Sequence, residues 1–347
     1  MKRWLLRVGG VLAVFGILGL LVAVLGLVPI AASSGHFAVT EWFLQFGKRR
    51  SVARHAPSLD PRELRAPWLV AKGAAHYDLG CRPCHASPGT ERTRLVLAMM
   101  PPPPRLDQPS HWTPGEHFYI VKNGLKFTGM PAFPSQRRDD EVKAVVAFLE
   151  VLPGLDAERY ERLARGDEPR VTGVVARCAP CHGADGLGRG SPAFPRLAGQ
   201  KKVYLVAALE AYARGERHSG IMEPVAAALD PGQILALAEH YAALRGAALP
   251  TSNDAAVERG REIAARGVPA RRVPSCADCH GPKPHRINDH YPLLAGQWED
   301  YQVQELERFS AGDRGGSPYS PLMERAAHSL TSQEMRDVAA FYAQEGQ

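Results

Sequence analysis

The sequence has no cysteine outside three copies of one short motif. The copies are Cys81–His85, Cys178–His182 and Cys276–His280, each of the form Cys-x-x-Cys-His, and they contain all six cysteines of the 347-residue chain. No cysteine is therefore left over to support a disulfide framework. A zinc site would need further Cys or His ligands at finger-like spacing, and no copy has a partner Cys-x-x-Cys pair at such a distance, while a redox dithiol does not require a histidine at the fifth position.

Cys-x-x-Cys-His is the attachment signature of c-type haem. The two thiols add to the vinyl groups of the macrocycle, and the adjoining histidine becomes the proximal ligand of the iron. Two intervening residues let one helical turn span the two vinyl positions. The motifs predict three covalently bound haem c groups, with His85, His182 and His280 as iron ligands. The thioether bonds are expected at Cys81, Cys84, Cys178, Cys181, Cys276 and Cys279.

The three motifs are evenly spaced along the chain. Their first cysteines lie 97 and then 98 residues apart, so each repeat has about the size of a common domain. Strand signals are nearly absent, which predicts an all-α fold of three tandem helical domains behind one transmembrane helix. We expect an anchor over residues 1–34, a linker over 35–67, and domains over 68–155, 156–250 and 251–347.

A long run near the N-terminus lacks charge. Val8–Ala32 contains 25 uncharged residues, about 37 Å as a helix, which is enough to cross the hydrocarbon of a bilayer. The alternative is a cleaved signal peptide, whose apolar core is usually shorter. Basic residues precede the run and none follows before Lys48, so the positive-inside rule places the N-terminus in the cytoplasm. We expect a bacterial inner-membrane protein with its haem domains in the periplasm.

The basic charge is concentrated in this same N-terminal region. The formal net charge is +6, of which residues 1–50 contribute +5, so the rest of the chain is close to neutral. A nucleic-acid partner gains no support from this distribution. Residues 41–46 contain Trp42 and Phe43 and fit either a membrane interface or a plain linker with a short helix.

Helix signals repeat from domain to domain. In the first domain, apolar residues over Asp139–Leu152 follow the spacing of an amphipathic helix. In the second, we expect helices over Lys201–Arg214 and from Pro231 to Leu244, the latter with Asp230 as N-cap. In the third, Thr331–Glu334 reads as a capping box for the final helix.

A haem with a methionine on its second face has no vacant site and suits electron transfer. The expected ligands are Met130, Met222 and Met323, which follow the motif histidines by 45, 40 and 43 residues and are expected in loops before the closing helices. Met99 and Met100 compete with Met130 but precede four prolines on the expected proximal side. Met335 is the remaining candidate. It fits core packing better because it lies inside the final helix.

Other residues near the haems have expected supporting roles. His218, His285 and His290 lie close enough in sequence to contest a haem face, and we expect surface or hydrogen-bonding roles for them. Proximal histidines usually donate their second ring N–H to a carbonyl. The recurring Pro-x-Leu step predicts that carbonyls beside three prolines accept these bonds, namely Pro104, Pro195 and Pro292.

These motifs resemble the class I c-type cytochromes over about residues 68–345. Residues 156–347 are similar to the two-haem cytochromes of the c-four type, through Cys178–Gly190 with Leu197–Gln200 and Cys276–Gly281 with Leu294–Gln297. In that family the axial methionine stands three residues before a small residue, as Met222 and Met323 do here. The Gly-Met-Pro-Ala-Phe stretch around Met130 resembles single-haem domains of dehydrogenase and oxidase subunits. Two departures are Ala86 in place of glycine and the segment 286–291.

The resemblance and the motifs together imply an electron carrier without an enzymatic reaction of its own. It would pass electrons in the periplasm from a respiratory donor to an acceptor such as a terminal oxidase or reductase. The alternative is the cytochrome subunit of a membrane-bound dehydrogenase of alcohols or sugars, because the chain has no catalytic domain of its own. A haem peroxidase needs a displaceable ligand, and the methionine candidates in all three domains argue against it.

Overall fold

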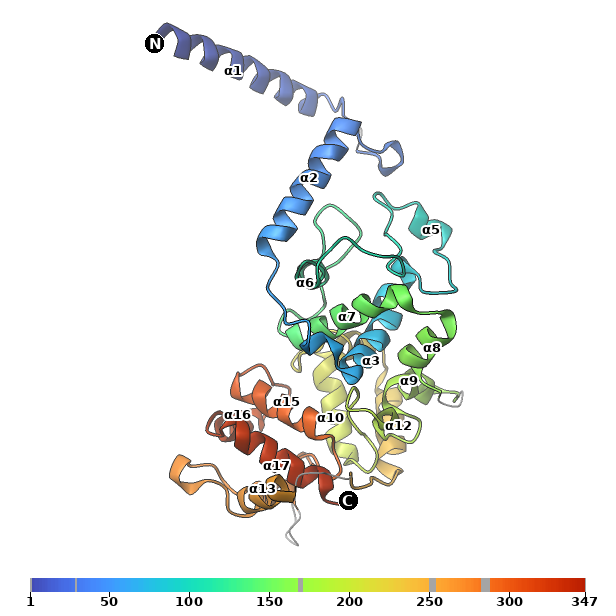
Figure 1. Ribbon diagram of the computed structural model, residues 1–347, viewed down its shortest axis with the longest axis vertical. Helices are drawn as coiled ribbons and strands as arrows, with labels where there is room; N and C mark the ends of the chain where they lie inside the picture. The colour runs from blue at the N-terminus through green and yellow to red at the C-terminus, as the bar shows by residue number, and fades with distance from the viewer. Residues whose placement is uncertain (1, 29, 168–170, 250–253, 282–287, 347) are drawn as a thin grey trace.

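The computed structural model describes residues 2–28, 30–167, 171–249, 254–281 and 288–346. The described residues form an all-helical protein, as predicted, with a single isolated β-bridge between Val268 and Val273. The chain runs from an isolated helix at one end of the molecule to tightly packed helices at the other (Figure 1).

The N-terminal helix α1 (Lys2–Val24) stands apart from the rest of the molecule (Figure 1). It is the one helix of the described residues that is long and apolar enough to cross a membrane, and none of its apolar window is buried against other parts of the chain. A signal sequence passes the same test, so the helix is compatible with either role.

The second helix, α2 (Ala38–His55), links α1 to the helical body (Figure 1). It is longer than the short helix that the sequence suggested. Its first half exposes Trp42 and Phe43, and the rings of Trp42 and Phe46 stack with their centroids 5.7 Å apart. Its last turns reach the body, where His55 stacks on Tyr119 of α6.

The first helical unit is built around α3 and α7, which cross at a glycine. A Cβ on Gly73 would lie 1.9 Å from the carbonyl oxygen of Ala144, so only glycine permits this approach. The helices of this unit are α3 (Pro67–His76), α4 (Arg82–His85), α5 (Arg94–Leu97), α6 (Pro114–Asn123), α7 (Asp139–Val151) and α8 (Ala157–Arg165).

Helix α8 belongs by packing to this first unit, although the sequence analysis placed residue 156 at the start of the second. Tyr160 is fully buried beside Tyr77 and Phe148, and its hydroxyl donates to Asp78 at 2.9 Å. Arg165 also pairs with Asp78. Residues 157–165 therefore extend the first core and do not form a free linker.

The second and third units follow their motif turns with helices in the same order. The third unit also shares a feature with the first, because α13 crosses α17 at a glycine. A Cβ on Gly260 would lie 1.9 Å from the carbonyl oxygen of Asp337, the same distance as at Gly73. The second unit comprises α9 (Ala179–His182), α10 (Lys202–Ala213), α11 (Met222–Ala227) and α12 (Pro231–Ala243). The third comprises α13 (Asp254–Arg266), α14 (Ala277–His280), α15 (Glu299–Ser310), α16 (Ser320–His328) and α17 (Ser332–Gln344).

The predicted helix starts are confirmed at both closing helices. Asp230 caps α12 and forms a capping box with Gln233, and Thr331 does the same for α17 with Glu334. The prediction that the axial-methionine candidates of these units lie in loops was wrong. Met222 begins α11 and Met323 lies within α16, because proline is tolerated in the first turn of a helix and so does not break these segments.

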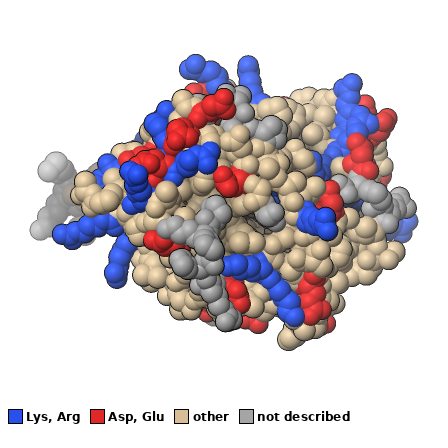
Figure 2. Space-filling view, turned by 90° about the horizontal axis from the view of Figure 1, so that it is seen from below, with Lys and Arg blue, Asp and Glu red and all other residues tan. Residues whose placement is uncertain are grey.

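Among the described residues, the surface at the end away from α1 has no area dominated by one sign of charge. Figure 2, which views that end, shows acidic and basic side chains interspersed over this face. This agrees with the near-neutral balance of the chain beyond residue 50.

Candidate haem sites

Each Cys-x-x-Cys-His motif folds into a single helical turn that ends at its histidine. These turns are α4, α9 and α14, and in the last two the histidine N–H donates to the carbonyl of the first cysteine at 2.9 Å. The turn brings both thiols and the imidazole to one location, as covalent haem attachment requires. None of the six cysteines forms a disulfide, and burial raises the pKa of the Cys81 thiol to about 12 and that of the Cys178 thiol to about 11.

All three motif histidines donate to proline carbonyls, which confirms the prediction from the Pro-x-Leu steps. The Nδ1 atoms of His85, His182 and His280 lie 2.8, 2.9 and 2.8 Å from the carbonyl oxygens of the three prolines, which are Pro104, Pro195 and Pro292.

The carbonyl partner fixes the tautomer of each imidazole. A carbonyl oxygen can only accept, so the proton is on Nδ1 and the lone pair of Nε2 is left for a metal. Burial lowers the pKa of His85, His182 and His280 below the ordinary value, against an opposing effect of the proline carbonyls. The rings are therefore neutral near pH 7, which is the form that ligates iron.

A tyrosine hydroxyl secures the residue after each histidine. Tyr77 donates to the carbonyl of Ala86 at 2.6 Å, and Tyr241 and Tyr342 donate to the equivalent glycines at 3.2 and 2.8 Å. The sequence reasoning missed these tyrosines, because Tyr77 precedes its motif while the other two lie about 60 residues beyond theirs in the closing helices.

The residue after each histidine adopts positive φ. Gly183 has φ of 80° and Gly281 of 82°, a conformation that costs glycine little. Ala86 has φ of 61° with ψ of −170°, a region that is occupied almost only by glycine. The departure from the family pattern at Ala86 therefore places local strain beside His85.

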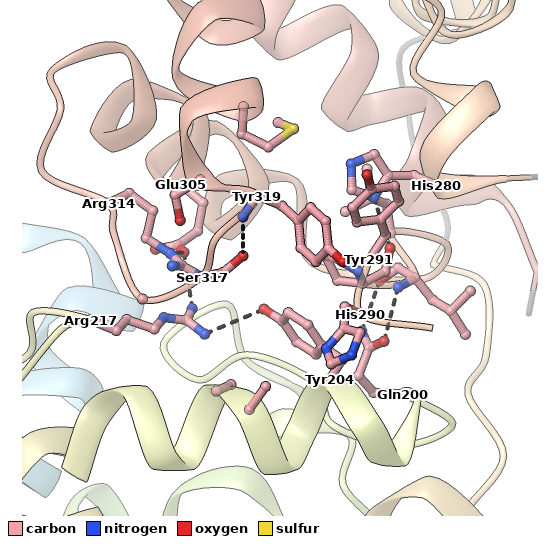
Figure 3. Close-up of a pocket in the computed structure, with 18 of the residues that line it drawn as sticks. Gln200, Tyr204, Arg217, His280, His290, Tyr291, Glu305, Arg314, Ser317 and Tyr319 are labelled. Atoms are coloured by element: carbon pink, nitrogen blue, oxygen red, sulfur yellow. Dashed lines mark hydrogen bonds and ion pairs between the residues drawn. The ribbon is translucent and has the colours of Figure 1, made fainter. Parts of the chain in front are cut away.

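A single cavity of about 720 Å³ lies between the second and third units (Figure 3). Its lining includes the motif histidines of both units and both of their predicted methionine ligands. Of the predicted site residues it contains Cys178, His182, Met222, Cys276, Cys279, His280 and Met323. Most of the remaining wall is apolar, from leucines, alanines and tyrosines of α10, α12, α15 and α17. The structure thus joins two predicted haem sites in one continuous space.

Two glutamines bind the second and third units to each other reciprocally. Gln200 donates to the carbonyl of Leu293 at 3.0 Å and accepts from its N–H at 2.9 Å. Gln297 makes the same pair of bonds with Arg196, both at 3.0 Å. Arg196 and Leu293 directly follow the prolines whose carbonyls hold His182 and His280. The two motif histidines are therefore fixed by one interface, which the glutamines of the two Leu-Ala-Gly-Gln segments form.

The polar side of the cavity carries excess positive charge. Arg217 and Arg314 line it, and their guanidinium groups approach the Glu305 carboxylate at 3.0 and 2.6 Å (Figure 3). Arg308 reaches the same carboxylate at 2.8 Å. Burial alone would raise the pKa of Glu305, but these guanidinium groups hold it well below its ordinary value.

This environment fits a haem. In the cavity lining, Arg217 and Arg314 face the single carboxylate of Glu305, which leaves one positive charge at the edge of a largely apolar cavity. Haem has an apolar macrocycle and two anionic propionates, so it complements both parts of the wall. The buried hydroxyl of Ser320 and the Nε of Arg217 also lack partners among the described residues, and both belong to the cavity lining.

The first unit holds its predicted ligands outside this cavity. Cys81, Cys84 and His85 lie around α4, and Met130 lies in the loop between α6 and α7. The Met130 N–H donates to the Thr128 hydroxyl at 3.1 Å, and the Met130 carbonyl accepts from Leu125 at 3.2 Å.

Met99 lies beside this loop as well. Its methyl carbon is 1.9 Å from the position that a Cβ on Gly129 would occupy. Because Met99 precedes the four prolines, the sequence predicts a position on the proximal side. The structure instead places it against the residue next to Met130, because Gly129 leaves room for the thioether.

The described residues include two of the other candidate histidines, His218 and His290. His218 lies 3.6 Å from Glu223. His290 is exposed at the cavity wall, with its ring 6.0 Å from that of Tyr319 (Figure 3). His285 lies outside the described residues.

Comparison with known proteins places these features in a family. A family model described as cytochrome c oxidase, cbb3-type, subunit III matches residues 69–149. The chain is 34% identical over 171 residues to a thiosulfate dehydrogenase electron acceptor of Thiomonas intermedia (strain K12), covering 49% of this chain and 78% of that protein. It is 36% identical over 177 residues to the protein of the same name from Stutzerimonas stutzeri (strain A1501), covering 49% and 79%.

A third relative carries the two-haem resemblance. Cytochrome c4 of Thiocapsa roseopersicina is 33% identical over 179 residues, covering 50% of this chain and 88% of that protein. The identities, the three attachment motifs and the all-helical fold agree with one another. The chain belongs to the multihaem c-type cytochromes, electron-transfer proteins with covalently bound haem c, and contains a segment of the cytochrome c4 type.

Proposed function

We propose that this protein is a membrane-anchored tri-haem cytochrome that carries electrons in the periplasm between a respiratory donor and an acceptor such as a terminal oxidase or reductase. The observation that carries the proposal is the threefold geometry of the motif histidines. Each is neutral, donates Nδ1–H to a proline carbonyl at 2.8–2.9 Å, and so offers Nε2 to iron.

The proposed roles follow from the chemistry of each side chain. The six cysteines would form the thioether bonds, and the three histidines would be the proximal ligands. The thioethers of Met130, Met222 and Met323 would fill the second axial positions. When bound, haem iron ligated in this way cycles between the ferric and ferrous states at a raised potential. The chain's own part is to exclude water and to hold both ligands in place, so that little rearrangement accompanies each change of charge.

The arrangement of the units supports transfer within the molecule. The second and third sites share one cavity wall, and the reciprocal bonds of Gln200 and Gln297 hold the two units face to face. We propose three haem domains, with the division between the first and second placed after α8. The apolar helix α1 would tether them to the membrane, with the N-terminus in the cytoplasm, and tethering raises the effective concentration at membrane partners.

Spin state tests this proposal. Redox titration of the purified full-length protein, followed by absorption and electron paramagnetic resonance, should give low-spin spectra for all three centres. High-spin ferric iron at one centre would mean an open coordination site, and the peroxidase alternative would then apply to that unit. Rapid oxidation of the reduced protein by peroxide would point the same way.

A second candidate is the electron acceptor of a dehydrogenase that oxidises thiosulfate. The names of the two relatives from Thiomonas and Stutzerimonas favour it over a partner that oxidises alcohols or sugars. The test is reduction of the oxidised protein by a purified thiosulfate dehydrogenase with thiosulfate, followed in a stopped-flow spectrometer. Reduction within turnover times supports this role. If only a co-purifying alcohol or sugar dehydrogenase reduces the protein, the thiosulfate role is wrong and the protein is the electron acceptor of that dehydrogenase.

A further inference from the structure

The loop that leads to Met222 is held by the first unit. This loop, residues 218–221, is the last part of the connection from α10 to α11 in the second unit. The Ser219 hydroxyl donates to Glu141 Oε1 at 2.8 Å, and the Gly220 N–H donates to Glu141 Oε2 at 2.6 Å. Glu141 belongs to α7 of the first unit and is only 3% exposed. One buried carboxylate thus receives two bonds from a loop almost 80 residues away in sequence.

A second set of bonds carries this contact to the methionine itself. The Met222 N–H donates to the Ser219 hydroxyl oxygen at 3.0 Å, and the Ile221 N–H donates to the same oxygen at 3.3 Å. Ser219 is 2% exposed. A continuous chain of hydrogen bonds therefore runs from Glu141 through Ser219 to the backbone of Met222.

Cations from two neighbouring units hold the start of the loop. The carbonyl of His218 accepts from Arg138 of the first unit at 3.0 Å and from Arg308 of the third unit at 3.1 Å. Arg138 also pairs with Glu141 at 2.7 Å, which gives this buried carboxylate its counter-charge.

Shape adds to these bonds. A Cβ on Gly220 would lie 2.1 Å from the ring of Phe133, so the loop fits closely against the first unit. The loop before Met222 is thus the point at which all three units meet.

The third unit provides an internal comparison. Ser320 stands three residues before Met323, as Ser219 stands before Met222. Its buried hydroxyl lines the cavity and has no partner among the described residues, whereas the Ser219 hydroxyl bonds to a carboxylate of another unit. The anchor on Ser219 is therefore not a general feature of the repeated fold.

We propose that Glu141 is a positioning residue for the second haem site, through which the first unit fixes the backbone of that site's distal ligand. The inference rests on the proposed function, in which Met222 is this ligand. Both carboxylate oxygens of Glu141 accept hydrogen bonds from the loop, whereas a glutamine amide has only one acceptor oxygen. A glutamine would turn an N–H toward either Ser219 or Gly220, and it would remove one of the two carboxylates that pair with Arg138, the other being Asp140.

The test uses the full-length haem-loaded protein and its Glu141→Gln variant. Hydrogen–deuterium exchange should become at least about tenfold faster at the amides of residues 219–222, the equivalent of about 1.4 kcal/mol. Exchange at residues 320–323 should stay unchanged. In the ferric protein, three methionine-ligated haems would contribute to the near-infrared methionine–iron absorption. The contribution of the second haem should weaken or shift in the Glu141→Gln variant. Glu150→Gln, a half-exposed change on the same helix, is the matched control and should alter neither signal.

Each remaining outcome decides one claim. Unchanged exchange at residues 219–222 in Glu141→Gln would overturn the positioning role. If Glu141→Gln fails to fold, Ser219→Ala replaces it, because that variant breaks the relay and keeps the Gly220 bond. If exchange rises but Met222→Ala leaves the methionine–iron absorption intact, the proposed ligand is wrong while the contact between the units stands.

Discussion

Glu305 is the single carboxylate among three guanidinium groups, and its neutralisation gives the sharpest test of the interface between the second and third units. In Glu305→Gln the shape is kept while Arg217, Arg308 and Arg314 lose their shared counter-charge, now at 3.0, 2.8 and 2.6 Å. Breaking a buried ion pair by removing one partner costs about 3–5 kcal/mol. The amide keeps one acceptor and the Glu305 side chain is 15% exposed, so we expect about 2–4 kcal/mol.

The assay is thermal unfolding followed by circular dichroism and by haem absorption. For a body of about 150–250 residues, each kcal/mol shifts the midpoint by about 2–4 °C, so the midpoint should fall by about 4–16 °C. The matched control is Glu307→Gln, an exposed position two residues along the same helix, which should stay within about 0.5 kcal/mol. A loss below about 1 kcal/mol in Glu305→Gln would refute the view that this carboxylate balances the buried arginines.

The remaining predictions concern strain, ligation and pH. Ala86→Gly should raise the free energy of unfolding of the first unit by about 1 kcal/mol in denaturant titrations. The substitution relieves backbone strain of about 1–3 kcal/mol and adds a glycine entropy cost of about 0.5–1 kcal/mol. A loss of stability would refute the strain at Ala86. Met222→Ala should make one haem in three high-spin by electron paramagnetic resonance, whereas Met335→Ala in α17 should cost about 2–5 kcal/mol of stability and leave all three spin states unchanged. Burial would raise the pKa values of Asp140 and Glu305, but neighbouring cations hold both well below their ordinary values. The two ionised carboxylates thus stabilise the folded protein above their unfolded-state pKa values, and this stabilisation is lost as the pH falls. The midpoint of denaturation should therefore decrease from about pH 5 downward. A midpoint that stays constant over this acid range would contradict the prediction.

Sequence patterns predicted the features that depend on local chemistry. The attachment motifs and the proline carbonyls that hold the three histidines follow from short-range spacing. The capping boxes at Asp230 and Thr331 do so as well. Hydrophobic periodicity located α7 to within two residues, and the N-cap signals at Asp230 and Thr331 located the starts of α12 and α17. Such features are readable because each is fixed by residues within one short segment, at most 19 positions apart for the histidine–proline bonds.

Features that depend on contacts between units could not be read in this way. Tyr160 draws α8 into the first core through contacts with residues more than 80 positions away, so the expected boundary at residue 156 falls before that helix. Glu141 has no signal in sequence that separates it from an ordinary helix glutamate. The helices at Met222 and Met323 were hidden by prolines, which are tolerated in a first turn but resemble breakers in sequence.

The central claim is that three motifs hold three covalent haems. The most direct measurement is the pyridine haemochrome content of the purified full-length protein per polypeptide, together with the intact mass of the denatured chain. We predict three haems for each chain, all retained after denaturation. A count of two or fewer, or haem released on unfolding, would contradict it.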